Sequence, residues 1–370
     1  MKITILQGAF FPVPPVLGGA VEKRWFALSK EFVRKGHSVV QISRSYENMK
    51  EEEWIEGVQH KRVRGHESPS SGIYLKWLDL LYTTRARKKI DSDTDVVVTN
   101  TFWSPLLLTR KLQTRCMVDV ARMPKGQMKW YRRVGRLRAN SDPVAEAIKK
   151  ETASPQHKQI CTIPNPLPFS EFSSFNVSEK KPVILFVGRI HPEKGIDLLL
   201  KAIQKLKNDW QVKIVGSSDV RTGGGGSAYL DHLISLNSVG NIEFIGPVYD
   251  VAELNRYYAE ASIFVYPSVS EKGETFGLAP LEAMAWGCVP VVSEISCFKD
   301  FIFNERNGLI FDHRDQSAVE LLTKAIARLQ YDKILRVKLA KEALEVRKTH
   351  SISNIACLFL QEFEKMRIGN

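Results

Sequence analysis

Short apolar runs alternate with helical patterns along the whole chain, and this alternation occurs twice. In the first half, predicted strands lie at residues 2–6, 38–42, 96–99, 116–120 and 159–163, with helical patterns at 20–35, 74–89 and 145–151. After a polar, Ser-rich stretch at 170–181 the pattern restarts, with predicted strands at 182–187, 212–215, 242–245, 263–265, 289–292 and 309–311. Strands that alternate with helices form doubly wound parallel sheets.

The sequence therefore predicts an α/β protein with two Rossmann-like domains that face each other across a cleft. We place the first domain at 1–168, a linker at 169–179 and the second domain at 180–351. The last helical segment, about 352–370, can pack on either domain, including back onto the first. A chain of 370 residues is long enough to build two full cores.

Composition points to an ordinary globular protein of the cytosol. Apolar residues make up 44% and charged residues 25% of the chain. No apolar run approaches the ~18–20 residues that span a bilayer, and the opening run Met1–Leu6 is too short for a signal peptide. The five cysteines are odd in number and widely spaced, which favours reduced thiols over disulfides or a zinc site.

The positive charge is concentrated in the first half. Residues 1–170 hold 29 Lys and Arg against 16 Asp and Glu, a net +13, whereas the remainder holds 24 against 25, a net −1. An excess of this kind indicates an anionic partner, such as a phospholipid surface or a lipid-phosphate acceptor. Nothing in the chain matches a nucleic-acid-binding module, so we do not expect nucleic acid as a partner.

Two carboxylates eight residues apart, Glu274 and Glu282, bracket a Gly-containing turn that opens a short helix. Pro280 suits the first helical turn and Gly287 suits the position after the helix end. An open helix N-terminus binds phosphate, and carboxylates accept hydrogen bonds from sugar hydroxyls. Eight steps of about 100° leave the two acids roughly 80° apart on a helix, so we expect Glu274 on the loop and Glu282 in the helix. The alternative is two solvated surface acids.

A second candidate phosphate site follows the first strand of the second domain. Val187 is followed by a glycine turn that carries Arg189 and Lys194 and ends at Gly195. Arg supplies a fork of donors and Lys a point charge, a pair suited to a pyrophosphate. Both candidate sites lie at carboxyl ends of strands, where open α/β sheets bind ligands. Taken alone, this loop is better explained by solvated charges at a strand end.

These residues resemble the retaining glycosyltransferases of the GT-B fold, family GT4 (glycosyl transferases group 1), over essentially the whole chain. The resemblance rests on four motifs: Gly188-Arg189 with Lys194-Gly195, Phe244–Val248, Tyr266-Pro-Ser268, and the Glu274–Glu282 element. It implies transfer of a hexose-type sugar from a nucleoside diphosphate sugar, UDP-sugar before GDP-sugar, to a glycan, lipid-linked or small-molecule acceptor. It also implies that no metal and no cofactor are needed.

The resemblance assigns roles to individual residues. Glu274 would hold hydroxyls of the transferred sugar, Glu282 the ribose, and the backbone at Phe276, Gly277 and Leu278 the phosphates. Arg189 and Lys194 would stabilise the leaving diphosphate, so Arg189, Lys194 and Glu274 are the catalytic candidates. The remaining donor-binding candidates are Val248 in the Gly-Pro-Val segment and Gly19 in the first domain.

The candidates in the first domain come from a glycine turn and from a position where the chain lacks a histidine that many relatives have. The segment Pro15–Glu22 resembles the family's G-G-x-x-E turn, in which Gly19 allows close approach to phosphate or sugar; the alternative is a plain loop with Glu22 as a favourable first-turn acid. Many relatives place a His just after the strand that corresponds to 116–120. This chain has none there, so Asp119 and Arg122 are its substitute candidates for donor-sugar contacts.

Four further segments carry weaker signals, and one different function is compatible with the sequence. Asp91-Ser-Asp93 contains a D-x-D pattern, but it precedes a strand, so we expect a solvated turn and no metal. Gly223–Gly226 is expected to be a mobile connection. Residues 73–89 and 128–138 have the pattern of basic amphipathic helices and predict peripheral contact with an anionic membrane at the inner face, although core-facing apolar residues explain the same pattern. A structural role such as a spore-coat component is the alternative function.

Overall fold

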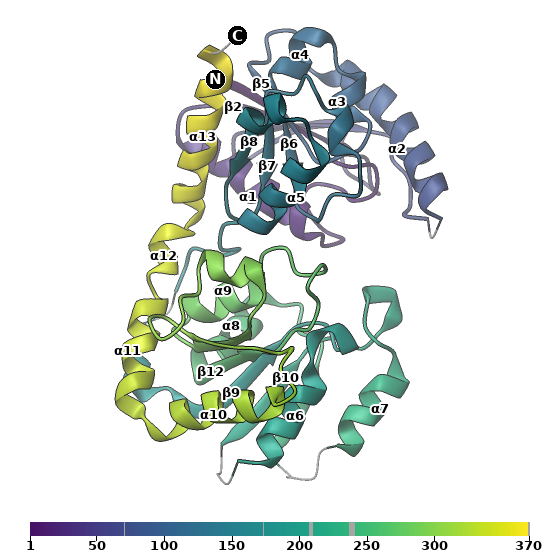
Figure 1. The fold of residues 1–370 in the computed structure, drawn as a ribbon. Coiled ribbons are helices and arrows are strands. Elements are labelled where there is room, and N and C mark those ends of the chain that lie inside the picture. The colour runs from purple at the N-terminus through teal and green to yellow at the C-terminus, as the bar shows by residue number, and fades with distance from the viewer. Residues whose placement is uncertain (70, 173, 207–209, 237–240, 369–370) are drawn as a thin grey trace. The chain divides into compact units, whose positions relative to one another are not determined.

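The computed structural model describes residues 1–69, 71–172, 174–206, 210–236 and 241–368, and it divides the chain into two compact units (Figure 1). Unit 1 is Met1–Phe169 together with His350–Asn370, and unit 2 is Ser170–Thr349. Each unit contains one Rossmann-like sheet of mainly parallel strands, which confirms the predicted α/β class.

Unit 1 is built on an eight-stranded sheet in the order β3-β4-β2-β1-β5-β6-β7-β8. All neighbouring pairs are parallel except β3–β4, which is a hairpin. The strands are β1 (Lys2–Leu6), β2 (Ser38–Arg44), β3 (Glu52–Ile55), β4 (Val58–Val63), β5 (Val96–Thr99), β6 (Cys116–Val120), β7 (Arg136–Ala139) and β8 (Ile160–Thr162).

The helices of unit 1 cover both faces of this sheet. They are α1 (Ala20–Arg34), α2 (Gly72–Ala86), α3 (Ser104–Leu107), α4 (Arg110–Thr114), α5 (Asp142–Glu151) and α13 (Ile352–Ile368). The C-terminal helix α13, yellow in Figure 1, packs on α1 through aromatic contacts: Trp25 lies 5.0 Å from Phe359, and Phe32 lies 5.8 Å from Phe363, measured between ring centroids. These rings are fully buried and form the centre of the unit 1 core.

The predicted helix at 128–138 is wrong. Its first part is a short 3-10 turn, Met128–Trp130, and its second part is β7, a strand inside the sheet with Leu137 and Arg138 buried. The spacing of its apolar residues imitated a helix because the turn shifts the register before the strand begins. The β3–β4 hairpin was not predicted either, because its strands carry charged residues instead of an apolar run.

Unit 2 contains six parallel strands in the order β11-β10-β9-β12-β13-β14. The strands are β9 (Lys181–Val187), β10 (Gln211–Val215), β11 (Ile242–Gly246), β12 (Ala261–Tyr266), β13 (Val289–Ser293) and β14 (Leu309–Phe311). Its helices are α6 (Ile196–Gln204), α7 (Ser227–Ser235), α8 (Val251–Glu260), α9 (Leu278–Ala285), α10 (Ala318–Tyr331), α11 (Lys333–Ala343) and α12 (Val346–Thr349). If the strands are numbered from β9, this is the 3-2-1-4-5-6 order of a Rossmann sheet. The chain adds strands first on one side of β9 and then on the other, so the switch point of the sheet lies between β9 and β12.

Candidate functional site

The two signature segments of the second half meet at the switch point of the unit 2 sheet. β9 and β12 are hydrogen-bonded neighbours, and the loops that leave their carboxyl ends carry Lys194 and Glu274 respectively. Gly195 lets these loops come close. It adopts a left-handed conformation (φ 62°), and a Cβ atom at this position would overlap the carbonyl oxygen of Pro267. Only glycine meets both demands without strain.

Lys194 and Glu274 form a buried ion pair at this point. Their side chains are only 9% and 8% exposed. The carboxylate of Glu274 also accepts a hydrogen bond from the Tyr266 hydroxyl at 3.1 Å, and the Ser268 hydroxyl lies 3.0 Å away. The Lys194 ammonium lies 5.3 Å from the centre of the Tyr266 ring. The structure thus joins two of the three predicted catalytic residues.

Tyr266 and Ser268 are site residues to which sequence reasoning gave no role. Burial, with Glu274 beside it, raises the pKa of Tyr266 well above its ordinary value, so the phenol stays protonated and remains a donor. The signal for both residues was the Tyr-Pro-Ser sequence at the end of a buried strand, since side chains there lie at the edge where ligands bind.

Arg189, the third predicted catalytic residue, lies in the same loop as Lys194 but is exposed. Its guanidinium donates a hydrogen bond of 2.6 Å to the carbonyl of Gly223. The glycine loop that accepts it is hydrogen-bonded to the chain around it: the amides of Gly224, Gly225 and Gly226 donate to carbonyls of Asp219, Ile190 and Ser218. The glycines are needed because left-handed φ angles of 83° and 86° occur at both ends of the loop.

The helix predicted between the two acids is α9. Gly277 precedes it with φ 91°, and a Cβ atom there would lie 2.6 Å from the Phe298 ring. Phe276 is buried and packs on Phe301, with ring centroids 5.4 Å apart. Leu278 is the first helical residue, and the first turn contains no acid. The N-terminal amides of α9 therefore have no carboxylate of their own first turn beside them.

Glu274 precedes α9 and Glu282 lies inside it, so the two acids do not share one helical face, as predicted. Oε2 of Glu282 accepts a hydrogen bond of 2.9 Å from the Tyr258 hydroxyl. Tyr258 is fully buried, and its pKa is raised well above the ordinary value by burial first and by Glu282 second. Tyr258 therefore fixes the orientation of the Glu282 carboxylate.

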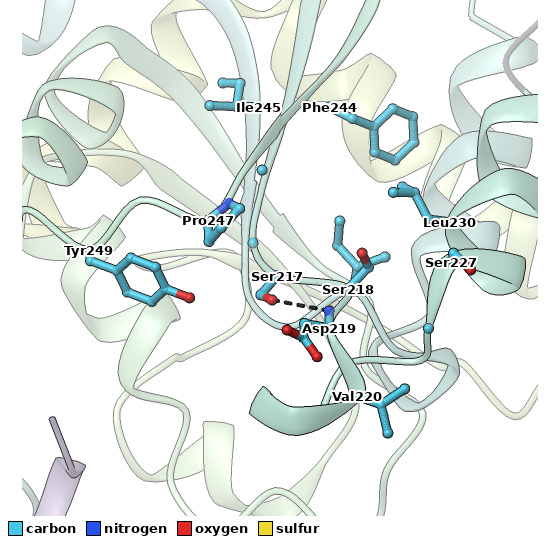
Figure 2. A pocket seen from close by; sticks show the side chains of 14 residues that line it. Ser217, Ser218, Asp219, Val220, Ser227, Leu230, Phe244, Ile245, Pro247 and Tyr249 are labelled. Carbon is cyan, nitrogen blue, oxygen red and sulfur yellow. Dashed lines mark hydrogen bonds between the residues drawn. The ribbon is translucent and has the colours of Figure 1, made fainter. Parts of the chain in front are cut away.

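A hollow of about 610 Å³ opens beside the Arg189 loop, at the carboxyl ends of β10 and β11 (Figure 2). Its walls are the chain from Gly216 to Val220, the start of α7, and the chain from Phe244 to Tyr249. Figure 2 shows the polar side chains of Ser217 and Asp219 on the β10 side and the rings of Phe244, Pro247 and Tyr249 on the β11 side. Val248 lies between two of these lining residues.

In unit 1, Gly19 precedes α1 with φ 90°, and the carboxylate of Glu22 lies against it. The prediction that Asp119 contacts the donor sugar is wrong, because its side chain is fully enclosed. It forms ion pairs with Arg24 and Arg138 and accepts a hydrogen bond from the Trp25 indole at 2.8 Å. These charges hold the pKa of Asp119 below its ordinary value despite burial.

Arg122 follows β6 and is exposed, so it is the substitute candidate whose side chain is open to a ligand. The buried arginines of the Asp119 cluster, Arg24 and Arg138, were not singled out from the sequence. Only burial distinguishes them from the many surface cations of the first half, and burial was not visible before the sheet was known.

The D-x-D segment is held in ion pairs. Asp91 pairs with Lys2 and Lys61, and Asp93 pairs with Lys2. Across the part of the chain that the structure describes, no cluster of three or more His, Cys, Asp and Glu side chains has the geometry of a metal site.

Known proteins are similar either to unit 2 alone or to both units. Residues 169–346 match the family model described as glycosyl transferases group 1. An uncharacterized glycosyltransferase of Methanocaldococcus jannaschii is 28% identical over 352 aligned residues and covers 84% of both chains. The solved structure of sucrose-phosphate synthase from Thermosynechococcus elongatus superposes on all of this chain and all of its own, with a TM-score of 0.78 and 20% identity. These matches support a glycosyltransferase of the GT-B fold.

Two further similarities concern parts or the fold of this glycosyltransferase. A glycogen synthase of Clostridium botulinum is 31% identical over 177 residues, which are 46% of this chain and 35% of the glycogen synthase. The chain therefore spans about a third of that relative. Anabaena HepE, solved in complex with UDP and glucose, superposes on 99% of this chain and 100% of its own with a TM-score of 0.71 and 15% identity. The family match is consistent with the GT4 resemblance.

Proposed function

We propose that this glycosyltransferase moves a hexose-type sugar, with retention, from a nucleoside diphosphate sugar to a glycan, lipid-linked or small-molecule acceptor. A UDP-sugar is the favoured donor and a GDP-sugar the second. The observation that carries the proposal is the buried Lys194–Glu274 pair at the β9–β12 switch point. A cation and a carboxylate held together there match the two halves of such a donor, a diphosphate and a sugar. A relative of the same fold was solved with UDP and glucose.

Residues of unit 2 suit each part of such a donor. The hollow at β10 and β11, about 610 Å³ with rings on one side, suits a nucleoside base. Arg189 and Lys194 and the amides at the start of α9 suit the diphosphate, and Glu274 suits the sugar hydroxyls. Glu282, oriented by Tyr258, suits the ribose.

In this proposal the pair exchanges partners when the donor binds. Lys194 gives up Glu274 for the diphosphate, and Glu274 accepts hydroxyls of the transferred sugar. As the glycosidic bond breaks, negative charge grows on the diphosphate, and Arg189, Lys194 and the α9 amides stabilise it. The departing diphosphate oxygen takes the proton of the acceptor hydroxyl, so the step needs no protein base. We propose that it needs no metal and no cofactor.

A donor-hydrolysis screen with UDP-, GDP- and ADP-sugars, with and without excess EDTA, tests this function. Lys194→Ala and Glu274→Ala should each reduce turnover by orders of magnitude, whereas Lys201→Ala, an exposed lysine on the neighbouring helix α6, should not. Near-normal turnover in either site variant contradicts the assignment. Complete loss of wild-type turnover in EDTA contradicts metal independence.

We also propose that unit 1 contacts an anionic membrane surface through α2. The first turns of α2 expose Ile73 (86%) and Trp77 (52%), and the +13 excess of residues 1–170 lies in the same unit. Within the residues that the structure describes, none of the helices is both long and apolar enough to cross a bilayer. Apolar side chains beside basic ones bind anionic lipid at an interface.

Vesicle sedimentation tests the membrane contact. Binding to phosphatidylserine-containing vesicles should fall with salt and should be weaker for Trp77→Ser, but unchanged for Trp54→Ser, an exposed tryptophan on β3 of the same unit. No binding at low ionic strength contradicts the proposal.

A further inference from the structure

The carboxylate of Glu22 occupies the N-terminus of α1. Glu22 lies in the first turn of this 15-residue helix and is 93% buried, since only 7% of it is exposed. Its carboxylate lies so close to Gly19 that a Cβ atom at Gly19 would overlap Oε2. The absence of a Cβ atom at Gly19, which has a left-handed φ of 90°, leaves the space in which the carboxylate sits.

This carboxylate has few donors around it. Its own backbone amide is a hydrogen-bond donor to it, and Arg24 and Arg122 act on it only through their fields, while burial raises its pKa. Among the residues that the structure describes, no side chain forms an ion pair with it. A carboxylate has about four acceptor positions, and a buried one without donors is unfavourable.

Glu320 gives the contrast, because it holds the same position in the first turn of α10. It is exposed, and it forms an ion pair with Lys205 that lowers its pKa. An acid in the first turn of a helix therefore need not be buried or lack an ion pair, as Glu22 is and does. The environment of Glu22 calls for a different explanation.

Other unpaired polar atoms lie at the same edge of the unit 1 sheet. Gln7 directly follows β1, and neither polar atom of its side-chain amide has a hydrogen-bond partner. Asn100 directly follows β5 and Ser141 lies just after β7; Oδ1 of Asn100 and the hydroxyl of Ser141 are also unpaired. β1 and β5 are neighbours at the switch point of this sheet. Buried polar atoms are normally paired, so this edge offers hydrogen bonds that a polar ligand would complete.

We propose that Glu22 binds a hydroxyl group of the sugar substrate, so that the N-terminus of α1 is a hydroxyl site and not a phosphate site. A phosphate at Gly19 would meet the negative charge of Glu22, whereas a hydroxyl supplies a further donor to a carboxylate whose hydrogen bond comes from its own backbone amide. The hydroxyl belongs either to the transferred sugar or to the acceptor. This inference rests on the proposed function, in which the turn at Gly19 would recognise a sugar hydroxyl.

The experiment compares wild type, Glu22→Gln, Glu22→Ala and the matched first-turn control Glu320→Ala, all as full-length protein with thermal unfolding recorded. UDP and UDP-glucose binding are measured by calorimetry, and transfer is measured with a panel of soluble sugar acceptors. Glu22→Ala should leave UDP affinity unchanged and weaken a sugar interaction about 10- to 100-fold, the loss expected for a hydrogen bond to a charged group. Glu22→Gln keeps the shape of the side chain and should lose less.

The arms identify the source of the hydroxyl. Weaker UDP-glucose binding assigns it to the transferred sugar, and a raised KM for the acceptor with unchanged donor binding assigns it to the acceptor. Tighter UDP binding in Glu22→Ala overturns the proposal, because it reveals a phosphate site, and so do parameters equal to those of Glu320→Ala. A wild-type protein that turns over no nucleotide sugar overturns the proposed function instead.

Discussion

Replacing Lys194 by Met separates what the Lys194–Glu274 pair contributes to stability from what it contributes to the reaction. Both side chains are less than a tenth exposed, so removal of the cation leaves a buried carboxylate without its counter-charge. Such losses cost about 3–5 kcal/mol. The Tyr266 and Ser268 hydroxyls remain near Glu274, which places the expected loss at the low end, about 3 kcal/mol. For a domain of this size that corresponds to a fall in Tm of about 6–12 °C.

The double variant Lys194→Met/Glu274→Gln completes the cycle. It removes both charges, so the free energy of unfolding should be less reduced than the sum of the single losses, by about 2 kcal/mol. Donor hydrolysis should stay as low as in the worse single variant, because neither the diphosphate nor the sugar hydroxyls regain their partner.

Scanning calorimetry and urea unfolding measure the stability half of this cycle, and donor hydrolysis measures the other. Single losses that add within about 0.5 kcal/mol would refute the coupling of the two side chains. Recovery of turnover together with stability would refute their role in the reaction, since it would show that the single variants were inactive only because unit 2 was destabilised.

Three further outcomes are expected. Gly195→Ala should destabilise unit 2 by several kcal/mol in urea unfolding and Gly246→Ala by only about 1–2 kcal/mol, because both have positive φ but only Gly195 touches a carbonyl; equal losses would contradict this. Asp119→Asn should lower the free energy of unfolding of unit 1 by about 3–5 kcal/mol, since it removes the counter-charge of two buried arginines; an unchanged Tm would contradict it. Burial raises the pKa of Asp79 from 3.8 to about 6, so wild type loses about 3 kcal/mol of stability as pH rises through this range, and Asp79→Asn should flatten that dependence in unfolding measured from pH 4 to 7.

The elements that the sequence predicted well are those with long apolar runs. β1, β5 and β6 begin and end at the predicted residues because most residues of each strand are apolar and nearly all of them are buried. β7 was missed because two of its four residues are arginines, and one of them, Arg138, is buried in an ion pair with Asp119. A local pattern does not show a counter-charge that arrives from another strand.

The same distinction applies to the candidate site. The segments with Lys194 and Glu274 were found because each carries its own local signal, a glycine turn or a helix start after a strand. That the two side chains meet depends on the order β9-β12, which no local pattern contains. Asp119 shows the same: it was a candidate because the His that many relatives have near this strand end is missing, but two arginines from α1 and β7 enclose it.

The N-termini of α9 and α1 differ in whether their first turn contains an acidic residue. α9 has no acid in its first turn, and its amides are left to an incoming anion. α1 has Glu22 in its first turn, and that carboxylate already lies against Gly19. A helix N-terminus favours a negative group within its first turn, so we expect a ligand phosphate at α9, whereas the protein's own carboxylate already lies at this position in α1. On this argument we expect the diphosphate to bind in unit 2 and Glu22 of unit 1 to recognise a hydroxyl group.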